Sequence, residues 1–369
     1  MNLEKISGLQ LFYIMIGFEI GNTVIFATGA DAKQDAWLAI LIAMLGGLIL
    51  MWVYVKLFQY YPDDTLIQMI PKIIGRYLAY PLILIYILYF IYLASTACRD
   101  FSELIVSTIL TETPMVVVIG CFMVLMIYSL RGGAEVFGRM GEMVFPVYIL
   151  VMVVMWILMA ISIDQFDLKR LTPVLGEGIK PVLDAVFPYP SPSILVFPFG
   201  ETILITMFFP FLNKKSNAKK TGMAVILVGG ILLTVNAIVM ISVLGPDIFK
   251  EEYFPLLSAA RMVSIADFLE RFDSLIILMM VAGVFFKVGG WTLGASIAIA
   301  QLFKLKSRES ILLSLGVIIT PFSIIHATNF VQFLENGKNF LGPYLNVPLQ
   351  IVIPVLLLGI AFLRKKFQS

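Results

Sequence analysis

Charged residues are scarce in this chain of 369 residues, of which Asp, Glu, Lys and Arg make up only 14%. Soluble domains average about 25% charged and about 45–50% apolar residues, whereas this chain is 60% hydrophobic, with a mean hydropathy of +0.97. An apolar excess of this size does not fit in a globular core, so we expect lipid to surround the protein. The formal net charge of only +2 and the lack of a basic tail indicate no nucleic-acid partner.

Histidine and cysteine are almost missing. His326 is the single histidine, and Cys98 and Cys121 are the only cysteines. They predict neither a disulfide framework nor a metal site, and we expect no cofactor. The sequence also lacks a nucleophile–base pair and a phosphate-binding loop, so an enzyme is the least favoured class. The N-terminal residues MNLEKIS lead directly into an apolar segment without a small-residue cleavage motif, so we expect a retained first span.

Long apolar runs occupy most of the chain. A membrane helix needs about 20 mostly apolar residues. Ten ranges meet this rule, namely 8–30, 36–58, 78–98, 114–130, 138–162, 185–212, 221–244, 274–303, 309–328 and 345–363. We therefore predict an all-α integral membrane protein with ten transmembrane helices in a single domain, 1–369. The connections 163–184 and 245–273 have helix-like apolar periodicity and are expected at the membrane surface. Most Lys and Arg residues lie in the loops on one side, which predicts cytoplasmic termini.

Two of these ranges have helix-breaking residues at their middle. In the first, Gly17, Gly21 and Asn22 surround Glu19, so we expect one half-helix to end near Phe18 and another to start near Asn22. In the sixth, four prolines between 188 and 198 cannot share one continuous helix, and Gly200 then begins a second half. In a membrane, broken backbone is tolerated only where it is buried in protein or lines a watery cavity.

The two breaks lie five spans apart. This spacing is typical of an inverted 5+5 repeat in which the first helix of each half is broken, and we predict the repeats as 1–163 and 180–369. Freed amides at half-helix N-termini attract anions, and freed carbonyls attract cations, so we expect a polar site near mid-membrane. The alternative is that these prolines and glycines only kink the helices and let them pack closely.

Only three charged residues fall near the middle of the predicted spans: Glu19, Glu201 and Lys287. A charge at this depth costs about 2.5–3.5 kcal/mol on insertion scales, so each needs a partner or a cavity. Lys287 has no carboxylate within one helical turn and must find Glu19 or Glu201 across the bundle. We expect a buried cluster of formal charge −1, completed by a proton, an ion or a ligand amine. A permanent structural ion pair is the alternative.

Three motifs carry a resemblance to a known family: KISGLQLFYIMIGFEIGNTV at the start, FPFGE in the sixth span and FFKVGGW in the eighth. With the two broken helices, they resemble the amino acid–polyamine–organocation (APC) transporter superfamily and its LeuT-like fold. Within it, the chain resembles the spore-germination permeases, the B subunits of nutrient germinant receptors. This resemblance implies sensing of an amino acid, nucleoside or sugar. It also implies assembly with an A subunit and a C-subunit lipoprotein in the spore inner membrane.

The candidate ligand-binding residues lie at the two breaks and on the spans that face them. They are Glu19, Gly21, Asn22, Thr23, Tyr92, Phe199, Gly200, Glu201, Thr202 and Lys287. Arg99, Asp100 and Glu103 lie just outside the third span, where a vestibule salt bridge and a functional role are equally open. The expected function is a receptor subunit that binds a small molecule, most readily an amino acid, and triggers germination through its partners. A proton- or sodium-coupled secondary amino acid transporter is the alternative, because the fold does not separate the two.

Overall fold

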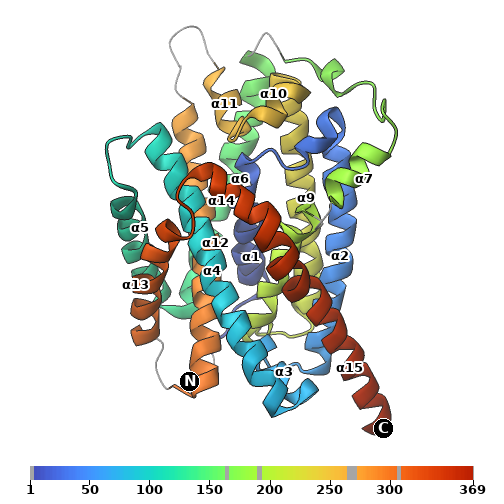
Figure 1. The fold of residues 1–369 in the computed structure, drawn as a ribbon, viewed down its shortest axis with the longest axis vertical. Helices are drawn as coiled ribbons and strands as arrows, with labels where there is room; N and C mark the ends of the chain where they lie inside the picture. Colours follow the sequence, from blue (N-terminus) through green and yellow to red (C-terminus); the bar gives the residue numbers. More distant parts are fainter. Residues whose placement is uncertain (1–3, 163–165, 189–192, 264–271, 306–308, 369) are drawn as a thin grey trace.

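The computed structural model describes residues 4–162, 166–188, 193–263, 272–305 and 309–368. Within these ranges the protein is helical, and the only β-pairing is an isolated parallel bridge between Ile6 and Leu212. The helices form one upright bundle (Figure 1). The two chain ends lie at the same end of this bundle, as an even number of crossings requires.

Among the described residues, seven helical segments are long and apolar enough to cross a membrane. They are α1 (Gly8–Ile20) with η1 (Thr23–Ile25), η2 (Ala30–Asp35) with α2 (Ala36–Tyr60), α4 (Arg76–Thr108), α6 (Gly133–Ser162), α9 (Asn217–Leu244), α12 (Asp273–Phe303), and α14 (Phe330–Asn336) with η6 (Gly337–Val352) and α15 (Ile353–Gln368). Three shorter apolar segments are α5 (Met115–Leu130), α8 (Ser193–Val196) with η4 (Phe199–Met207), and α13 (Glu309–Ile325). These segments coincide with the ten predicted ranges, and the all-α membrane fold is confirmed.

Short helices connect the long ones. They are α3 (Leu66–Ile74), η3 (Leu168–Leu171), α7 (Lys180–Val186), η5 (Phe209–Phe211), α10 (Pro246–Glu251) and α11 (Pro255–Arg261). The helical character predicted for 163–184 and 245–273 is therefore confirmed in η3, α7, α10 and α11, while 163–165 and 264–271 lie outside the described residues. Helices α10 and α11 lie at the end of the bundle opposite the two chain ends (Figure 1).

The first break follows the predicted residues. Helix α1 begins with a capping box, in which the Ser7 hydroxyl accepts from the Gln10 amide and the Gln10 side chain accepts from the Ser7 amide. The α-helix ends at Ile20, and the chain continues after a turn as η1. The turn packs backbone to backbone against α12. A Cβ atom added to Gly21 would lie only 2.7 Å from the Gly283 carbonyl oxygen, which leaves no space for a side chain. A glycine is required at this contact.

The second break separates α8 from η4 at Phe197 and Pro198. Two of the prolines that predicted it, at 190 and 192, lie outside the described residues. The second half differs from an ordinary α-helix, because η4 winds as a 3₁₀-helix over nine residues. The Thr202 and Thr206 hydroxyls donate to carbonyl oxygens three residues back, at 2.5 and 2.7 Å, which suits this tighter winding.

The last predicted span, 345–363, is part of a longer segment that starts at Phe330. Its middle part, η6, is a π-helix that contains Pro343 and Pro348. Wide π-type turns relieve the clash that proline causes in an α-helix. The segment runs diagonally across the bundle in front of α1 (Figure 1), and η6 packs against α8 and η4, the two sides of the second break. The predicted repeat boundaries, 1–163 and 180–369, stay a prediction.

Candidate functional site

A buried ion pair joins the second break to α12. Helix α12 carries Lys287, and the first turn of η4 carries Glu201. The Lys287 Nζ lies 2.7 Å from the Glu201 carboxylate, and the two side chains are only 2% and 5% exposed. The Phe197 ring centre lies 4.1 Å from the same Nζ, and this cation–π contact adds to the stabilisation of the ammonium. The predicted pairing of Lys287 with a central carboxylate is confirmed for Glu201.

Glu19 is not a member of this ion pair, but it lies within Coulombic range of Lys287, so the predicted cluster of Glu19, Glu201 and Lys287 is supported. Its side chain is 0% exposed, and among the described residues neither carboxylate oxygen has a hydrogen-bond partner. The carboxyl group packs against Gly229 of α9, where an added Cβ would lie 2.8 Å from the Glu19 Cδ. The Glu19 carbonyl oxygen accepts from the Thr23 hydroxyl at 2.8 Å, which ties the end of α1 to η1. The geometry therefore places Thr23 as a residue that shapes the break.

A second carboxylate stands beside the first break. The Asn22 side-chain amide donates to Asp100 Oδ2 of α4 at 2.7 Å. Neighbouring Arg99 forms an ion pair with Glu103 at 2.6 Å. Of the two roles left open for Arg99, Asp100 and Glu103, the structure thus shows a salt bridge for Arg99 and Glu103, and Asp100 takes no part in it. Asp100 was not among the predicted site residues, because three charged residues within five positions, Arg99, Asp100 and Glu103, resemble the end of a span. The signal that could have found it is its spacing of eight residues from Tyr92, which places both on one face of a continued helix.

A cavity of about 540 Å³ lies beside the two breaks. Tyr92, Thr96 and Asp100 line it from one face of α4, and Glu201 lines it from η4. Asn346 lines it from η6, and Phe26 and Phe197 add aromatic surface. The structure thus combines apolar walls with a few convergent polar groups, which is the usual make-up of a small-molecule site.

The predicted site residues divide into two groups. Tyr92 and Glu201 line the cavity directly, and Asn22 reaches it through Asp100. The other seven lie behind the cavity wall, and they are Glu19, Gly21, Thr23, Phe199, Gly200, Thr202 and Lys287. A Cβ on Gly200 would collide with the Gln350 side chain. The structure thus shows a packing role for this glycine and for Gly21.

A hydrogen-bond network connects the cavity to three helices. The Tyr89 hydroxyl of α4 donates to the Asn346 side chain at 2.8 Å and accepts from Gln350 Nε2 at 2.6 Å. The Tyr54 hydroxyl of α2 is 2.7 Å from the Gln350 carbonyl oxygen and 3.3 Å from that of Gly200, so one hydroxyl bridges η6 and η4. A displacement of Asn346 would therefore be transmitted through Tyr89, Gln350 and Tyr54 to Gly200 at the second break.

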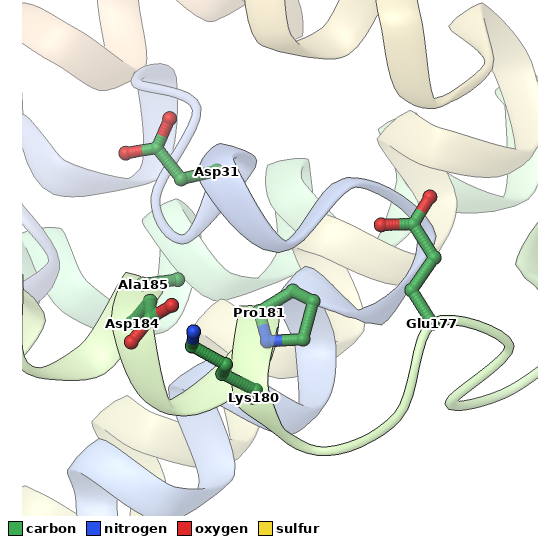
Figure 2. A pocket seen from close by; sticks show the side chains of 6 residues that line it. All are labelled: Asp31, Glu177, Lys180, Pro181, Asp184 and Ala185. Carbon is green, nitrogen blue, oxygen red and sulfur yellow. The ribbon is translucent and has the colours of Figure 1, made fainter.

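An outer pocket of about 530 Å³ adjoins the cavity and shares Asp31 and Ala185 with it. Figure 2 shows Glu177 on the loop that leads to Lys180, with Asp31 on a separate segment. Asp31 is exposed and lies 3.1 Å from Lys250 of α10. Exposed ion pairs of this kind contribute only about 0–1 kcal/mol to stability.

The fold and the cavity define a multi-pass membrane protein with transporter architecture. The structure is similar to MhsT in complex with L-phenylalanine, with a TM-score of 0.66 and 14% identity over 98% of this chain and 89% of that chain. It is also similar to Mhp1, a nucleobase-cation-symport-1 family transporter, closed around bromovinylhydantoin. There the TM-score is 0.69 and the identity 12%, over 90% of this chain and 75% of the other. At these identities the likeness concerns the fold alone.

Sequence relatives identify the family. A family model described as "Spore germination protein" matches residues 5–331, and the chain belongs to this family. Spore germination protein KB of Bacillus subtilis (strain 168) is 34% identical over 366 residues, which cover 99% of this chain and 97% of the relative. Spore germination protein YndE of the same strain is 27% identical over 371 residues, which cover 98% of each chain. The resemblance drawn from the sequence motifs is confirmed.

Proposed function

We propose that this protein is the nutrient-sensing membrane subunit of a germinant receptor. It binds a small molecule in the cavity beside the two helix breaks and passes the resulting change to A and C partner subunits. The observation that carries this proposal is that Glu201, at the start of the broken sixth segment, both lines the cavity and holds Lys287 of α12. A ligand that contacts Glu201 therefore acts on the joint between two spans.

The site suggests how binding becomes a signal. A ligand shifts the balance between two states only through a difference in its affinity for them. Contact with Glu201 alters its bond to Lys287, and contact with Asn346 alters the network through Tyr89 and Gln350. Both routes act on segments that depart from α-helical winding, the 3₁₀-helix η4 and the π-helix η6. Such departures often mark hinges and functional sites. The partners would then respond to the position of α12 and of the segment that contains η6.

The alternative is a secondary amino acid transporter coupled to protons or sodium. One observation favours it, namely that the solved structures with this fold include a Na⁺-coupled sialic acid symporter, at a TM-score of 0.65 and 11% identity. A transporter must cycle between two open states and release its ligand on the far side of the membrane. A receptor needs only a ligand-induced change in the populations of its two states. Both proposals share the cavity, a multi-pass location with cytoplasmic termini, and no enzymatic step. The spore inner membrane belongs to the receptor proposal.

Binding and uptake in one proteoliposome preparation separate the two functions. The probes are radiolabelled amino acids, nucleosides and glucose, tested with and without proton and sodium gradients. Saturable binding without accumulation supports the receptor. Gradient-driven accumulation refutes it in favour of the transporter. If neither binding nor accumulation occurs, the same binding assay is made on the chain co-reconstituted with A and C subunits. Absence of binding there would refute both the receptor and the transporter proposal.

A further inference from the structure

Among the residues that the structure describes, the cavity wall next to the helix breaks carries one carboxylate without an ion-pair partner, Asp100. Asp100 and Glu201 both line the cavity, and Glu201 is paired with Lys287 at 2.7 Å. Within the described ranges, the hydrogen-bond partner of Asp100 is the neutral Asn22 amide. Lys287 acts electrostatically on Asp100 and on Glu19 and is paired with Glu201, so one ammonium faces three carboxylates within Coulombic range. The formal charges of these four groups sum to −2.

Arg99 does not supply the missing positive charge. Its guanidinium is held by Glu103 at 2.6 Å and also donates to the carbonyl oxygens of Ile324 and Ala327, at 3.3 and 3.4 Å. These partners lie on α4 itself and at the end of α13, and Arg99 is not part of the cavity wall. Asp100 is half-buried, so its carboxylate is accessible from the cavity.

Unused acceptor capacity accompanies the unpaired charge. The Asn22 side chain is 1% exposed, and its Oδ1 has no hydrogen-bond partner among the described residues. Its amide orientation is fixed, because the opposite orientation would place an amide oxygen against the Asp100 carboxylate. A buried acceptor without a donor is unfavourable. Asn22 is not part of the cavity wall, so its role is to orient Asp100. An ammonium group has three donors and no acceptor, so it complements the Asp100 carboxylate in both charge and hydrogen bonding.

The outer part of the cavity carries one net positive charge. Asp31, Lys250 of α10 and Lys338 of η6 line it, and Asp31 balances Lys250 at 3.1 Å, which leaves Lys338. A cavity that is negative at the breaks and has lysines farther out fits a molecule with an ammonium at one end and a carboxylate at the other. A neutral sugar or nucleoside would leave the charge of Asp100 uncompensated in a water-poor site, which is costly.

We propose that Asp100 binds the ammonium group of the ligand, and that the ligand class is therefore an amine-bearing nutrient, an α-amino acid first of all. This assignment rests on the proposed ligand-binding function. It moves amine recognition away from Glu19, which packs against Gly229, and away from Glu201, which Lys287 already neutralises.

The test is equilibrium binding to the full chain in lipid nanodiscs. The probes are radiolabelled L-alanine, L-leucine and L-phenylalanine, with glucose and inosine as neutral probes. Deaminated competitors (propionate, 4-methylpentanoate and 3-phenylpropionate) keep the carboxylate and side chain but lack the ammonium. Removing one partner of a buried charge pair lowers binding affinity strongly, because the other charge stays buried and unpaired. We therefore expect the deaminated analogue to bind about 100-fold more weakly than its amino acid.

The variant Asp100→Asn removes the charge with almost no change in volume, and we expect it to lose about 100-fold in amino-acid affinity. Asp184→Asn is the matched control, because Asp184 is exposed on α7 and lines only the outer pocket. Gel filtration and thermal unfolding show whether each variant folds. If Asp100→Asn does not fold, the deaminated competitors on the wild-type protein still decide.

Three outcomes would overturn the assignment. Binding of glucose or inosine with no binding of amino acids refutes it but leaves the sensing function intact. Amino-acid binding that survives in folded Asp100→Asn, or that deaminated analogues match, also refutes it without touching the sensing function. Absence of binding by every probe, to the chain alone and then to the chain co-reconstituted with A and C subunits, contradicts the proposed function and the amine assignment together.

Discussion

The variant Lys287→Met tests the energetics of the buried ion pair. It removes the cation that lies 2.7 Å from Glu201 and leaves that carboxylate 5% exposed without a charge partner. Breaking a buried pair by removing one partner costs about 3–5 kcal/mol, because the remaining charge is uncompensated. Methionine is also flexible and packs well against the Phe197 ring, so lost packing adds little. We therefore expect destabilisation of about 3–5 kcal/mol from electrostatics alone.

Thermal unfolding of the purified protein in nanodiscs measures this effect. At about 2 °C per kcal/mol, the lower end of the range for large domains, Tm should fall by roughly 6–10 °C. Lys338→Met is the matched control, because Lys338 is exposed, and a surface change of this kind stays within about 0.5 kcal/mol, or about 1 °C. If Lys287→Met lowers Tm by less than about 2 °C, the reasoning is refuted, since burial of the Glu201 carboxylate would then not depend on the Lys287 ammonium.

Two further predictions concern packing and the network, with Tm as the readout. Gly283→Ala places a methyl group against the Gly21 backbone, which cannot give way, so we expect a loss of at least about 3 kcal/mol, whereas Gly120→Ala, with open space around its Cβ position, should be neutral. Equal effects of the two changes would contradict the close contact of α1 with α12. Tyr89→Phe removes the hydroxyl that accepts from Gln350 and should cost about 1–3 kcal/mol; an unchanged Tm would show that the network does not stabilise η6.

The sequence predicted the breaks well because their causes are local. Prolines and glycines act on their own backbone, so both breaks could be located from neighbouring residues. Helix α1 ends at Ile20 and not near Phe18 as predicted, and η4 starts at Phe199, one residue before the predicted Gly200. The partner of Lys287 could be found by elimination, since few charges lie near mid-membrane. Pairing with Glu201 and not with Glu19 depends on how η4 faces α12, which a single sequence does not contain.

The missed features are long-range or depend on where a helix ends. The third span was predicted to stop at residue 98, but α4 continues to Thr108, and this extra length turns Asp100 from a loop charge into part of the cavity wall. Gly21 was expected to offer backbone to a ligand, yet it faces Gly283, 262 positions along the chain. The requirement for small residues at this contact comes from tertiary packing, and sequence spacing gives no sign of it.

The double variant Lys287→Met/Glu201→Met separates stability from function. Replacing both members of a buried ion pair with apolar residues of similar size is often neutral or stabilising, so we expect Tm to return to within about 2 °C of the wild-type value. A fold that needs the pair only as a packing element would then keep its ligand affinity. Because Glu201 also lines the cavity, we expect the double variant to lose amino-acid binding while it remains stably folded. Wild-type affinity in the stable double variant would assign the pair to packing, and the coupling between cavity and α12 would then have to run through Asn346 and the Tyr89 network alone.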